Sequence, residues 1–491
     1  MAPDLSLKSI KNQVDEGQRV CLILGKFNVV HPGHLRLFRH AKEICDHLVI
    51  GVYPDDWSPD LLLPATERLA GVRANTWVDA AFLLKGGIEK AIIDLRPDVV
   101  LKGKEHETLE NIEKLPVESY GGVLRFAGGD LRLSSSALLQ AEEGYQNSLI
   151  HHADDYLTRH QISKGDLIGQ VEAMSNVRVL VIGDLIIDRY IDCHPIGMSA
   201  EDPTIVVSPF ATKLFVGGAG IVASHACQLG GASTLVSICG DDEQGRFATT
   251  ELEKSGVIMH VFSDSDRPTT LKTRYRANNQ TLLRVNELRD HQIDHERSAE
   301  ILSCILDVLP EFDLVIFSDF SYGLLTEALV ENTIRAGQAR NLVMAGDSQS
   351  SSQVGDLARF RNLSLLTPTE KEARLAVRDS NSGLVGISQS LGKLTNGKHI
   401  PITLGGEGVF LHAPESNGKT WEDDRIPALN VNPVDVSGAG DAFLVSTAIC
   451  LAAGVDIWAA IYIGSIASGC QVSRMGNVPL SKDDLLRAIR T

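Results

Sequence analysis

The sequence predicts an α/β protein of two units, each built on a parallel sheet with crossover helices. Short apolar runs alternate with helix-like segments from Arg19 onward, a pattern typical of βαβ units. The alternation stops near Leu139 and resumes at Val177. A chain of 491 residues is too long for one ordinary hydrophobic core, and domain-size scaling suggests about two or three domains. The second unit shows no repeat of the first.

The first unit opens with the run RVCLIL at 19–24, which predicts a buried strand. The amphipathic pattern LRLFRHAKEICDH at 35–47 predicts the helix that follows it. Further strand signals are LVIGVY at 48–53, DVVLKG at 98–103 and VLRFA at 123–127. The alternation ends near the stretch LRLSSSALLQ, so residues 1–139 form the predicted first domain.

Residues 140–175 combine helical periodicity and abundant charge with no strand signal. They predict a helical connector, and a contact between copies of a homo-oligomer is the alternative. The strand run VRVLVIGDLIIDRY begins at Val177, and α/β alternation continues to the C-terminus. Residues 176–491 therefore form the predicted second domain.

The composition restricts the partners. Hydrophobic residues make up 43% of the chain and charged residues 22%, as in an ordinary globular protein, and no apolar run reaches membrane-spanning length. The start lacks a signal-peptide pattern, and the eight cysteines form no C-x-x-C pair, so a reducing cytoplasm is expected. A formal charge of −17 argues against nucleic acid or an anionic membrane as partner, whereas small anionic substrates remain compatible with local basic pockets.

The stretch GKFNVVHPGH, residues 25–34, places two histidines at a strand-to-helix turn. His34 is expected at the helix N-terminus, with Pro32 and Gly33 making the turn. Unpaired backbone N–H groups and the helix dipole favour phosphate there, and imidazoles can donate hydrogen bonds to it. A metal site would need further His, Cys or carboxylate ligands at recognisable spacing, and none stands nearby. Two histidines that merely cap a turn are the simplest alternative.

The same stretch resembles the G-x-F-D-x-x-H-x-G-H signature of the cytidylyltransferase-like nucleotidyltransferases, which have a Rossmann-like fold. Three further stretches follow in that family's order, namely ERLAGVRANTWVD, LKGKEHE and LSSSALL. The resemblance implies that His31 and His34 stabilise a triphosphate while a substrate phosphate oxygen attacks the α-phosphorus and pyrophosphate leaves. Gly25 and Phe27 would contact the nucleotide. Such a reaction needs positioning and positive charge, and it needs no covalent nucleophile.

The later stretches of this resemblance supply further candidates. Lys102 would provide a cation, and the hydroxyls of Ser135 and Ser136 would approach the nucleotide phosphates. A solvated lysine and a helix N-cap are the alternatives for these residues. Asn28 stands where the family usually has Asp, so any task that depends on a charge at this position is lost.

The string NPVDVSGAGDAF, residues 432–443, predicts an anion-binding turn with a base beside it. The backbone N–H groups of Gly438, Ala439 and Gly440 can surround a transferring phosphoryl group at the start of a helix. Asp441 then stands where a carboxylate could accept a proton from an attacking hydroxyl. A glycine-rich turn capped by Asp is the alternative.

The full D-x-x-G-A-G-D string resembles the second signature of the ribokinase/phosphofructokinase-B sugar kinases, which implies a ribokinase-like α/β domain. VIGDLIIDRY carries Asp184 and Asp188, which match family positions near sugar hydroxyls, although strand-end capping is the alternative for both. VGGAGIVASHACQLGG, with Gly217 and Gly218, resembles the first kinase signature. PITLGGEGVF, with Gly405, resembles the strand and turn that line the nucleotide.

Within that family the chain most resembles the heptose 7-phosphate kinase domain, through MSAEDPTIVV, PTTLKTRYRANNQTLLRV, LVIFSDFSYGLL and SLLTPTEKEA. Lys272 and Arg274 are then candidates for the substrate's own phosphate, because a phosphorylated sugar needs cationic donors. A solvated basic edge is the competing account. The resemblance also implies ATP as donor, Mg²⁺ held through water by Glu372, and a monovalent cation such as K⁺ at Asp435.

Two departures bear on the sugar. Ile221 occupies a position where the family usually places a substrate-binding Asn, and Thr369 replaces the Asn of the N-x-x-E element. The first change removes a hydrogen-bond partner for the sugar, and the second affects the water network around Mg²⁺.

A sugar kinase joined to a nucleotidyltransferase resembles the bifunctional ADP-heptose synthesis enzymes, with the domain order reversed. The resemblance implies a chain that phosphorylates a sugar phosphate and then activates it as a nucleotide sugar. Two alternatives stay open. One is a kinase–transferase for another sugar phosphate, with CTP in place of ATP in the first domain. The other is a protein with one active site and a binding or regulatory second domain.

Overall fold

The computed structural model describes residues 7–490 except 12–13, 15–16, 28–29, 31, 58–63, 104–110, 128–149, 200–201, 203, 278–279, 350–355 and 414–422. The chain divides into two compact units. Unit 1 comprises Met1–Gln146, Val377–Ser390 and Asp423–Arg425, and unit 2 comprises Asn147–Ala376, Leu391–Glu422 and Ile426–Thr491. Among the described residues, no helix is long and apolar enough to cross a membrane.

Unit 1 contains a five-stranded parallel sheet with the strand order β3-β2-β1-β4-β5. Its elements are α1 (Leu7–Lys11), β1 (Val20–Gly25), α2 (Pro32–Ile44), β2 (His47–Val52), α3 (Ala65–Arg73), β3 (Ala80–Leu83), α4 (Ile88–Leu95), β4 (Val99–Gly103), α5 (Lys114–Glu118) and β5 (Val123–Ala127). The strand order reverses between β1 and β4, and α/β sheets bind ligands outside the carboxyl ends of their strands at such a point. The parallel α/β fold predicted for the N-terminal domain is confirmed.

Apolar residues from the strands and helices of unit 1 form its core. Leu22 of β1, Val49 of β2 and Ile92 of α4 are fully buried within it. Helix α2 begins at Pro32, so the predicted turn at Pro32 and Gly33 is corrected to the first helical turn. Proline suits the first helical position because its missing N–H would have no partner there. His34 is consequently the third residue of α2.

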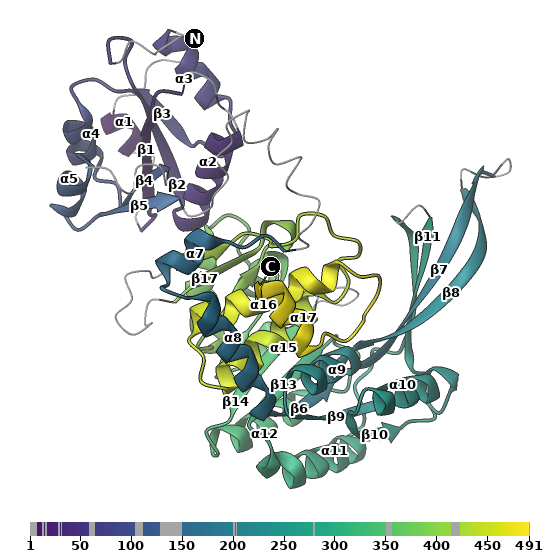
Figure 1. The fold of residues 1–491 in the computed structure, drawn as a ribbon. Helices are drawn as coiled ribbons and strands as arrows, with labels where there is room; N and C mark the ends of the chain where they lie inside the picture. Colours follow the sequence, from purple (N-terminus) through teal and green to yellow (C-terminus); the bar gives the residue numbers. More distant parts are fainter. Residues whose placement is uncertain are drawn as a thin grey trace. The chain divides into compact units, whose positions relative to one another are not determined.

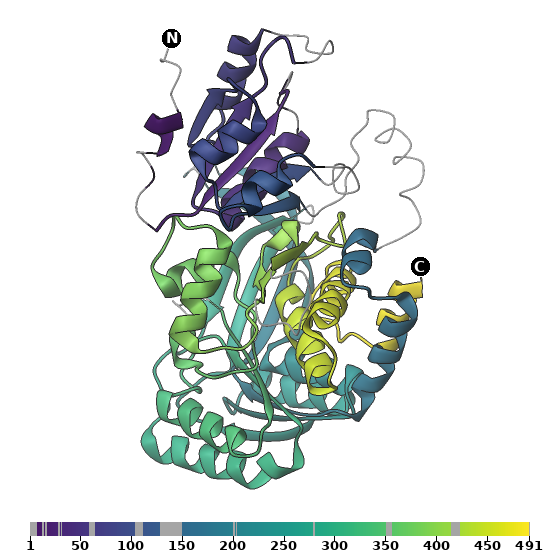
Figure 2. The ribbon, with the colours of Figure 1, turned by 90° about the vertical axis from the view of Figure 1, so that its left-hand side faces the viewer.

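Unit 2 is built on a six-stranded parallel sheet with the order β10-β9-β6-β13-β14-β15. Figure 1 labels most of its elements, and Figure 2 shows the yellow C-terminal helices on one side of the sheet and green helices on the other. The strands of this sheet are β6 (Arg178–Gly183), β9 (Ala232–Cys239), β10 (Ile258–Ser263), β13 (Leu314–Asp319), β14 (Val343–Ser348) and β15 (Leu365–Leu366). The α/β fold predicted for the C-terminal domain is confirmed.

The helices of the C-terminal part of the chain are α7 (Asp154–Arg159), α8 (Lys164–Ala173), α9 (Ala219–Leu229), α10 (Glu243–Lys254), α11 (His295–Val308), α12 (Glu327–Gln338), α13 (Glu370–Val377), α14 (Leu384–Thr395), α15 (Ala439–Ala452), α16 (Ile457–Val472) and α17 (Lys482–Arg490). A three-stranded sheet contains β16 (Ile402–Thr403), β17 (Val409–His412) and β18 (Asp423–Ile426). Helices α15 and α16 contact one another along the core of unit 2.

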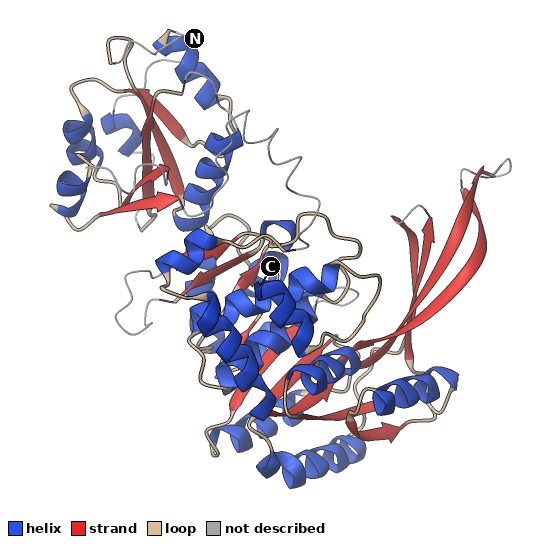
Figure 3. Cartoon of the chain, in the orientation of Figure 1, coloured by secondary structure: helices blue, strands red, loops and turns tan. Residues whose placement is uncertain are grey.

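A second sheet of unit 2 has the order β12-β11-β7-β8, formed by β7 (Leu185–Met198), β8 (Ile205–Gly218), β11 (Thr270–Ala277) and β12 (Gln280–Glu287). Figure 3 shows its long strands extending from the helical body of unit 2. The run predicted as one strand from Val177 to Tyr190 is corrected to two strands, β6 and β7, in different sheets. The chain leaves the main sheet after Gly183, where a Cβ would lie 2.0 Å from the backbone oxygen of Ser318 on β13. Asp184 stands at this junction.

The segment expected to connect the domains contributes to the core of unit 2 over its described part. Tyr156 of α7 is 1% exposed, and its hydroxyl donates a hydrogen bond of 2.8 Å to the backbone oxygen of Trp458 on α16. Leu167 and Val171 of α8 are fully buried in the same core. The sequence showed only helical periodicity here, because an apolar helix face does not identify the surface that covers it.

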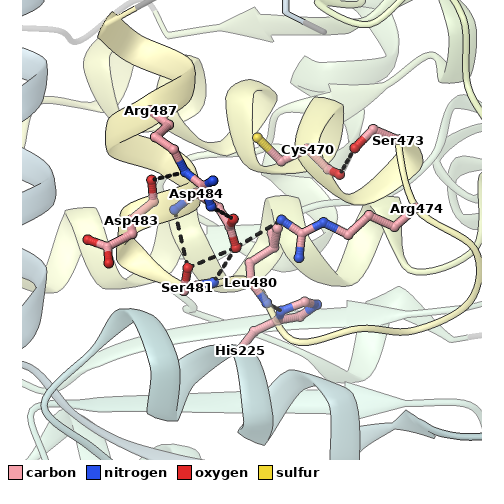
Figure 4. A network of polar contacts seen from close by, with 9 residues as sticks. All are labelled: His225, Cys470, Ser473, Arg474, Leu480, Ser481, Asp483, Asp484 and Arg487. Carbon is pink, nitrogen blue, oxygen red and sulfur yellow. Dashed lines mark hydrogen bonds and ion pairs between the residues drawn. The ribbon is translucent and has the colours of Figure 1, made fainter.

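A polar network joins the segment after α16 to the C-terminal helix (Figure 4). The carboxylate of Asp484 accepts hydrogen bonds from Ser481 Oγ at 2.8 Å and from the Arg487 guanidinium at 2.7 Å. The Arg474 guanidinium forms an ion pair with the same carboxylate at 2.8 Å. The network fixes the start of α17 relative to the loop that carries Arg474.

His225 on α9 lies beside this network and contributes a pH-dependent term to stability. Its Nδ1 accepts a hydrogen bond of 3.0 Å from Leu480 N, so the ring is anchored in a fully buried position. Burial, aided by the charge of Arg474, lowers the pKa of His225 to about 3. The unfolded chain binds a proton here below about pH 6.5 and the folded chain does not, so stability is lost as the pH falls from about 6.5 toward 3.

When the pH is lowered from 6.5 to 5, we expect the free energy of unfolding of the wild type to fall further than that of His225→Gln. The extra loss should be about 1.5 kcal/mol, since one pKa unit corresponds to about 1.36 kcal/mol. Urea unfolding of both proteins at both pH values measures this difference. An identical pH dependence in the wild type and His225→Gln would contradict the assignment.

Candidate functional site

Asp441 lies in the first turn of α15, and its side chain is 7% exposed. Gln349 Nε2 donates a hydrogen bond of 3.3 Å to Asp441 Oδ1. Burial raises the pKa of Asp441 to about 7 against the opposing charge of Lys272, and the charge of Asp188 adds to the rise. A carboxyl group with a pKa near neutrality can accept a proton from a hydroxyl at physiological pH.

The glycine turn before Asp441 is open to a ligand. Gly438 caps α15 with a φ of 76°, a conformation that glycine adopts at little cost. The next residues, Ala439 and Gly440, begin the helix, where backbone N–H groups lack helical partners. No heavy atom of the described residues would lie within 4 Å of a Cβ at Gly440. The turn can therefore receive a phosphate group.

Gly405 lies in a second turn of unit 2. It follows β16, and its φ of 59° is in the left-handed region. A Cβ at this position would meet no heavy atom of the described residues within 4 Å. Its conformation and open surroundings are compatible with the predicted contact to a nucleotide.

Asp184 and Asp188 lie on either side of the start of β7. Asp184 Oδ2 accepts hydrogen bonds from the backbone N–H groups of Phe320 at 2.9 Å and Tyr322 at 3.3 Å. Burial, with the charge of Asp319, raises the pKa of Asp184 to about 6. Asp184 thus holds the turn after β13, as strand-end capping would predict. Asp188 instead contacts side chains from other elements.

Gly217 and Gly218 end β8 beside these two aspartates. A Cβ at Gly217 would lie 2.3 Å from Asp188 Oδ2, and a Cβ at Gly218 would lie 2.3 Å from the backbone oxygen of Asp184. Gly218 also has a φ of 55°. Both glycines are required because the backbone of β8 passes directly against the two aspartates.

Lys272 and Arg274 lie on β11, which pairs with β7 in a register that puts Lys272 opposite Asp188 and Arg274 opposite Tyr190. Arg274 forms an ion pair with Asp188. Lys272 is 4% exposed, its Nζ lies 4.2 Å from the ring centroid of Phe320, and burial lowers its pKa to about 8. The alternative of a solvated basic edge is therefore wrong for Lys272.

Two buried carboxylates on neighbouring elements fit a divalent cation. Glu372 of α13 is 8% exposed, and its Oε2 accepts hydrogen bonds from Thr369 N at 2.9 Å and Thr369 Oγ1 at 2.8 Å. Asp347 of β14 is 7% exposed, and its Oδ1 has no hydrogen-bond partner among the described residues. Burial raises the pKa of Asp347 well above its ordinary value, and the charges of Glu372 and Asp441 add to the rise.

Carboxylate oxygens are preferred ligands of Mg²⁺, so an unpartnered buried carboxylate oxygen suits this ion. The described residues contain no group of three or more His, Cys, Asp or Glu arranged around a metal. Mg²⁺ often keeps several waters and binds substrate phosphates through one or two carboxylates, which is compatible with this arrangement.

Asp435, the candidate ligand for a monovalent cation, already accepts several hydrogen bonds. Its Oδ1 accepts from Ser437 N at 3.1 Å, and its Oδ2 accepts from the Tyr190 hydroxyl at 2.9 Å and from Gly476 N at 3.0 Å. Burial raises the pKa of Asp435, but the hydrogen bonds from Ser437 and Gly476 outweigh it and hold the pKa below its ordinary value. A cation at Asp435 would share the carboxylate with these donors.

The described part of the first candidate site lies at the end of β1. Gly25 ends β1, and a Cβ there would lie 2.9 Å from the Phe27 ring. The Phe27 ring, in a residue with a φ of 48°, lies 4.9 Å from the His34 ring between centroids. Gly25, Phe27 and His34 therefore converge at the carboxyl end of β1. Three other candidates lie outside the described residues: His31, Ser135 and Ser136.

Lys102 lies near the end of β4, the strand across the switch point from β1. Its Nζ donates a hydrogen bond of 2.8 Å to Oε1 of Glu113, which is 1% exposed. The alternative of a solvated lysine is wrong, because only 17% of this side chain is exposed and its charge is paired.

Burial, with the charge of Glu113, raises the pKa of Tyr53 to about 12, and the Tyr53 ring stacks on Trp57 with 4.5 Å between the ring centroids.

Four residues of these sites escaped the sequence analysis: Glu113, Asp347, Gln349 and Asn477. The last of these, Asn477, donates a hydrogen bond from Nδ2 to Asp188 Oδ2 at 2.9 Å. Asp347 had a usable signal, since it stands near the carboxyl end of a parallel strand, where α/β proteins place their ligand-binding groups. Gln349, directly after the same strand, shares this signal. Glu113 and Asn477 occupy segments with no motif, and only the folded chain brings them to the sites.

Comparisons with known proteins show which families the two regions of the chain match. Residues 176–483 match the family model of the pfkB family carbohydrate kinases. This chain belongs to that family. Residues 22–123 match the cytidylyltransferase-like family model. In this member of the pfkB family the kinase-like region therefore follows a nucleotidyltransferase-like region, as the sequence predicts.

Curated relatives include the bifunctional protein HldE of Bradyrhizobium diazoefficiens, which is 29% identical over 330 residues, 66% of this chain and 65% of the relative. The bifunctional protein HldE of Geotalea uraniireducens is 30% identical over 317 residues, 64% of this chain and 63% of the relative. The chain thus spans less than two thirds of the length of these relatives.

Two solved structures share the fold. Phosphofructokinase-2 from Escherichia coli, in complex with substrates and products, matches with a TM-score of 0.53 and 16% identity over 64% of this chain and 98% of that one. Ribokinase from Arabidopsis thaliana, complexed with ribose and ATP, matches with a TM-score of 0.50 and 15% identity over 64% of this chain and 99% of that one.

Proposed function

We propose that this chain is a bifunctional enzyme, a sugar-phosphate kinase joined to a nucleotidyltransferase. Its substrate would be heptose 7-phosphate and its final product ADP-glycero-manno-heptose, formed through the 1-phosphate. The observation that supports the kinase most directly is the buried Asp441 at an open glycine turn. The likeness to bifunctional HldE proteins and the two family matches support the pairing of activities.

In the proposed kinase reaction, Asp441 accepts the proton of the anomeric hydroxyl as the sugar oxygen attacks the γ-phosphorus of ATP. The bond between the γ-phosphorus and the bridging oxygen breaks, and ADP leaves. The N–H groups of Gly438, Ala439 and Gly440 would stabilise the charge on the transferring phosphoryl group. Asp188 would orient the sugar.

Mg²⁺, when bound with ATP, would offset phosphate charge, with Glu372 and Asp347 as the carboxylates that hold it through water. A K⁺ ion at Asp435 is a further part of the proposal. Replacing potassium with choline in the assay tests it, because a requirement for K⁺ would appear as a loss of rate at constant ionic strength.

In the proposed transferase reaction, an oxygen of the sugar 1-phosphate attacks the α-phosphorus of ATP, and pyrophosphate leaves. His31, His34 and Lys102 would stabilise the triphosphate, with Ser135 and Ser136 at the nucleotide phosphates. The anomeric phosphate made by the kinase is the nucleophile that this step consumes. A separate phosphatase would have to remove the 7-phosphate between the two steps.

The test is a screen of sugar phosphates against ATP and CTP. The intact chain is assayed for ADP formation with heptose 7-phosphate and with hexose 6-phosphates, and for pyrophosphate release with the matching sugar 1-phosphates. We expect heptose 7-phosphate with ATP to give the highest kcat/KM in the assay of ADP formation. Heptose 1-phosphate with ATP should give the highest kcat/KM in the assay of pyrophosphate release. Faster turnover of another sugar phosphate, or of CTP, would replace the substrate assignment while keeping the reaction type. Activity in only one assay would support a binding or regulatory role for the other unit.

A further inference from the structure

Asn477 lies between the two parts of the kinase site. It stands in the loop between α16 and α17, and it is 9% exposed. Its Nδ2 donates a hydrogen bond of 2.9 Å to Asp188 Oδ2, across 289 positions of sequence. The amide is thus attached at one end to the carboxylate proposed to orient the sugar.

The other end of this amide faces the phosphate-binding turn. Asn477 Oδ1 has no hydrogen-bond partner among the described residues. It would lie 2.7 Å from a Cβ at Gly438, so it lies directly against the turn that precedes Asp441. A buried acceptor without a partner is costly, and it becomes favourable when a ligand supplies a donor.

The loop that carries Asn477 is held on both sides. Gly476 N donates to Asp435 Oδ2 at 3.0 Å, and Gln471 Nε2 donates to the Gly476 backbone oxygen at 2.9 Å. Leu480 N donates to His225 Nδ1 at 3.0 Å, as Figure 4 shows. Asn477 therefore occupies its position before a ligand arrives, which is the property expected of a positioning group.

We propose that Asn477 is a substrate-positioning residue whose Oδ1 accepts a hydrogen bond from a hydroxyl of the sugar phosphate. The inference rests on the proposed kinase function and adds a specificity determinant to it. A hydroxyl group is the ligand that fits, because it needs a single acceptor and the same sugar would contact Asp188. Ile221, which is 1% exposed and apolar, offers no competing hydrogen bond from α9.

The experiment compares the wild type with Asn477→Ala, using heptose 7-phosphate and its monodeoxy analogues as probes. In the wild type, we expect one analogue to lose about 10- to 100-fold in kcat/KM relative to the parent sugar, because it leaves Oδ1 unpaired. In Asn477→Ala, we expect the parent sugar to fall to the level of that analogue while KM for ATP stays unchanged.

Asn430→Ala is the matched control. Asn430 is also 9% exposed in unit 2, but its Oδ1 accepts from Asn432 N and its Nδ2 donates to the Gly469 backbone oxygen. Its replacement should lower stability and leave the discrimination among analogues intact. If Asn477→Ala weakens all analogues and ATP equally and keeps the wild-type discrimination, the positioning role is overturned.

Titration calorimetry separates failure of this inference from failure of the proposed function. Binding of heptose 7-phosphate and its analogues is measured with the wild type and Asn477→Ala without ATP. Discrimination that depends on Asn477 supports the inference even when turnover of heptose 7-phosphate is absent, which would refute only the proposed substrate. Equal discrimination in both proteins overturns the inference even when turnover is normal.

Discussion

Replacing Asp441 with Asn is expected to slow phosphorylation of the sugar by a factor of about 10²–10⁴, the usual effect of losing a general base. The amide has nearly the same shape as the carboxylate and can still accept the hydrogen bond from Gln349, so the glycine turn should keep its geometry. The initial rate of ADP formation measures the effect. Pyrophosphate release by the N-terminal unit should be largely unchanged in the same preparation.

Two further measurements distinguish a lost base from a damaged fold. The kcat/KM of the wild-type kinase should rise with pH through about 7, as Asp441 loses its proton, and this rise should be absent in Asp441→Asn. The folded chain binds the Asp441 proton more tightly than the unfolded chain. The wild type therefore loses stability as the pH rises from about 4 to about 7. A shift of about three pKa units costs on the order of 4 kcal/mol at pH 8.

The Asn variant escapes that cost and should be at least as stable as the wild type at pH 8. Asp456→Asn, at the N-cap of α16, is the matched control, since Asn also caps helices and this residue lies outside the proposed site. A variant at Asp441 that is both inactive and destabilised at pH 8 would contradict a catalytic role. Equal loss of both activities would count against two independent sites.

Replacing His34 with Ala is expected to slow pyrophosphate release by a factor of about 10²–10³, the usual effect of removing one preorganised donor to transition-state charge. The His34 ring lies in the first turn of α2 against Phe27, at the carboxyl end of β1, where the helix N-terminus also favours phosphate. The rate of pyrophosphate release with saturating sugar 1-phosphate measures the loss, and the kinase activity should stay within about twofold.

Zinc analysis distinguishes a phosphate site from a metal site at this turn. His40→Ala, on the same helix but beside Glu43, is the matched control and should keep the wild-type rate. Zinc analysis of the wild type should find no stoichiometric metal. Tightly bound zinc that disappears when His31 and His34 are both replaced would refute the phosphate interpretation.

Much of the fold and of the two sites could be predicted because their signals are local. The strand runs and the helix pattern after RVCLIL depend on side-chain periodicity, which neighbouring residues carry. The glycine turn and Asp441 are contiguous in sequence, so their chemistry can be inferred before folding. The histidine pair of the first site could be identified from the sequence because the two residues are also close together in the chain.

Other features depended on contacts that no local pattern encodes. The break between β6 and β7 falls at Gly183 and Asp184. Gly183 still pairs with Ser318 of β13, whereas the Asp184 carboxylate accepts hydrogen bonds from backbone N–H groups after β13, contacts that join distant parts of the sequence. Helices α7 and α8 showed only an amphipathic pattern, and their partners lie far along the chain. Tyr156 of α7 donates a hydrogen bond to Trp458, 302 positions away, and α8 contacts α17. A sequence pattern indicates that one face of a helix is buried, and it does not identify the residues that cover that face.

By itself, the sequence determined the class of fold, the order of the two units and the groups that carry the proposed chemistry. Only the tertiary structure decided the electrostatic state of those groups. The register of β11 against β7 puts Lys272 opposite Asp188, and the loop before α17 brings Asn477 to the same carboxylate. Burial and charge then move the pKa of Asp441 to about 7, because both effects depend on atoms that are close in space and distant along the chain.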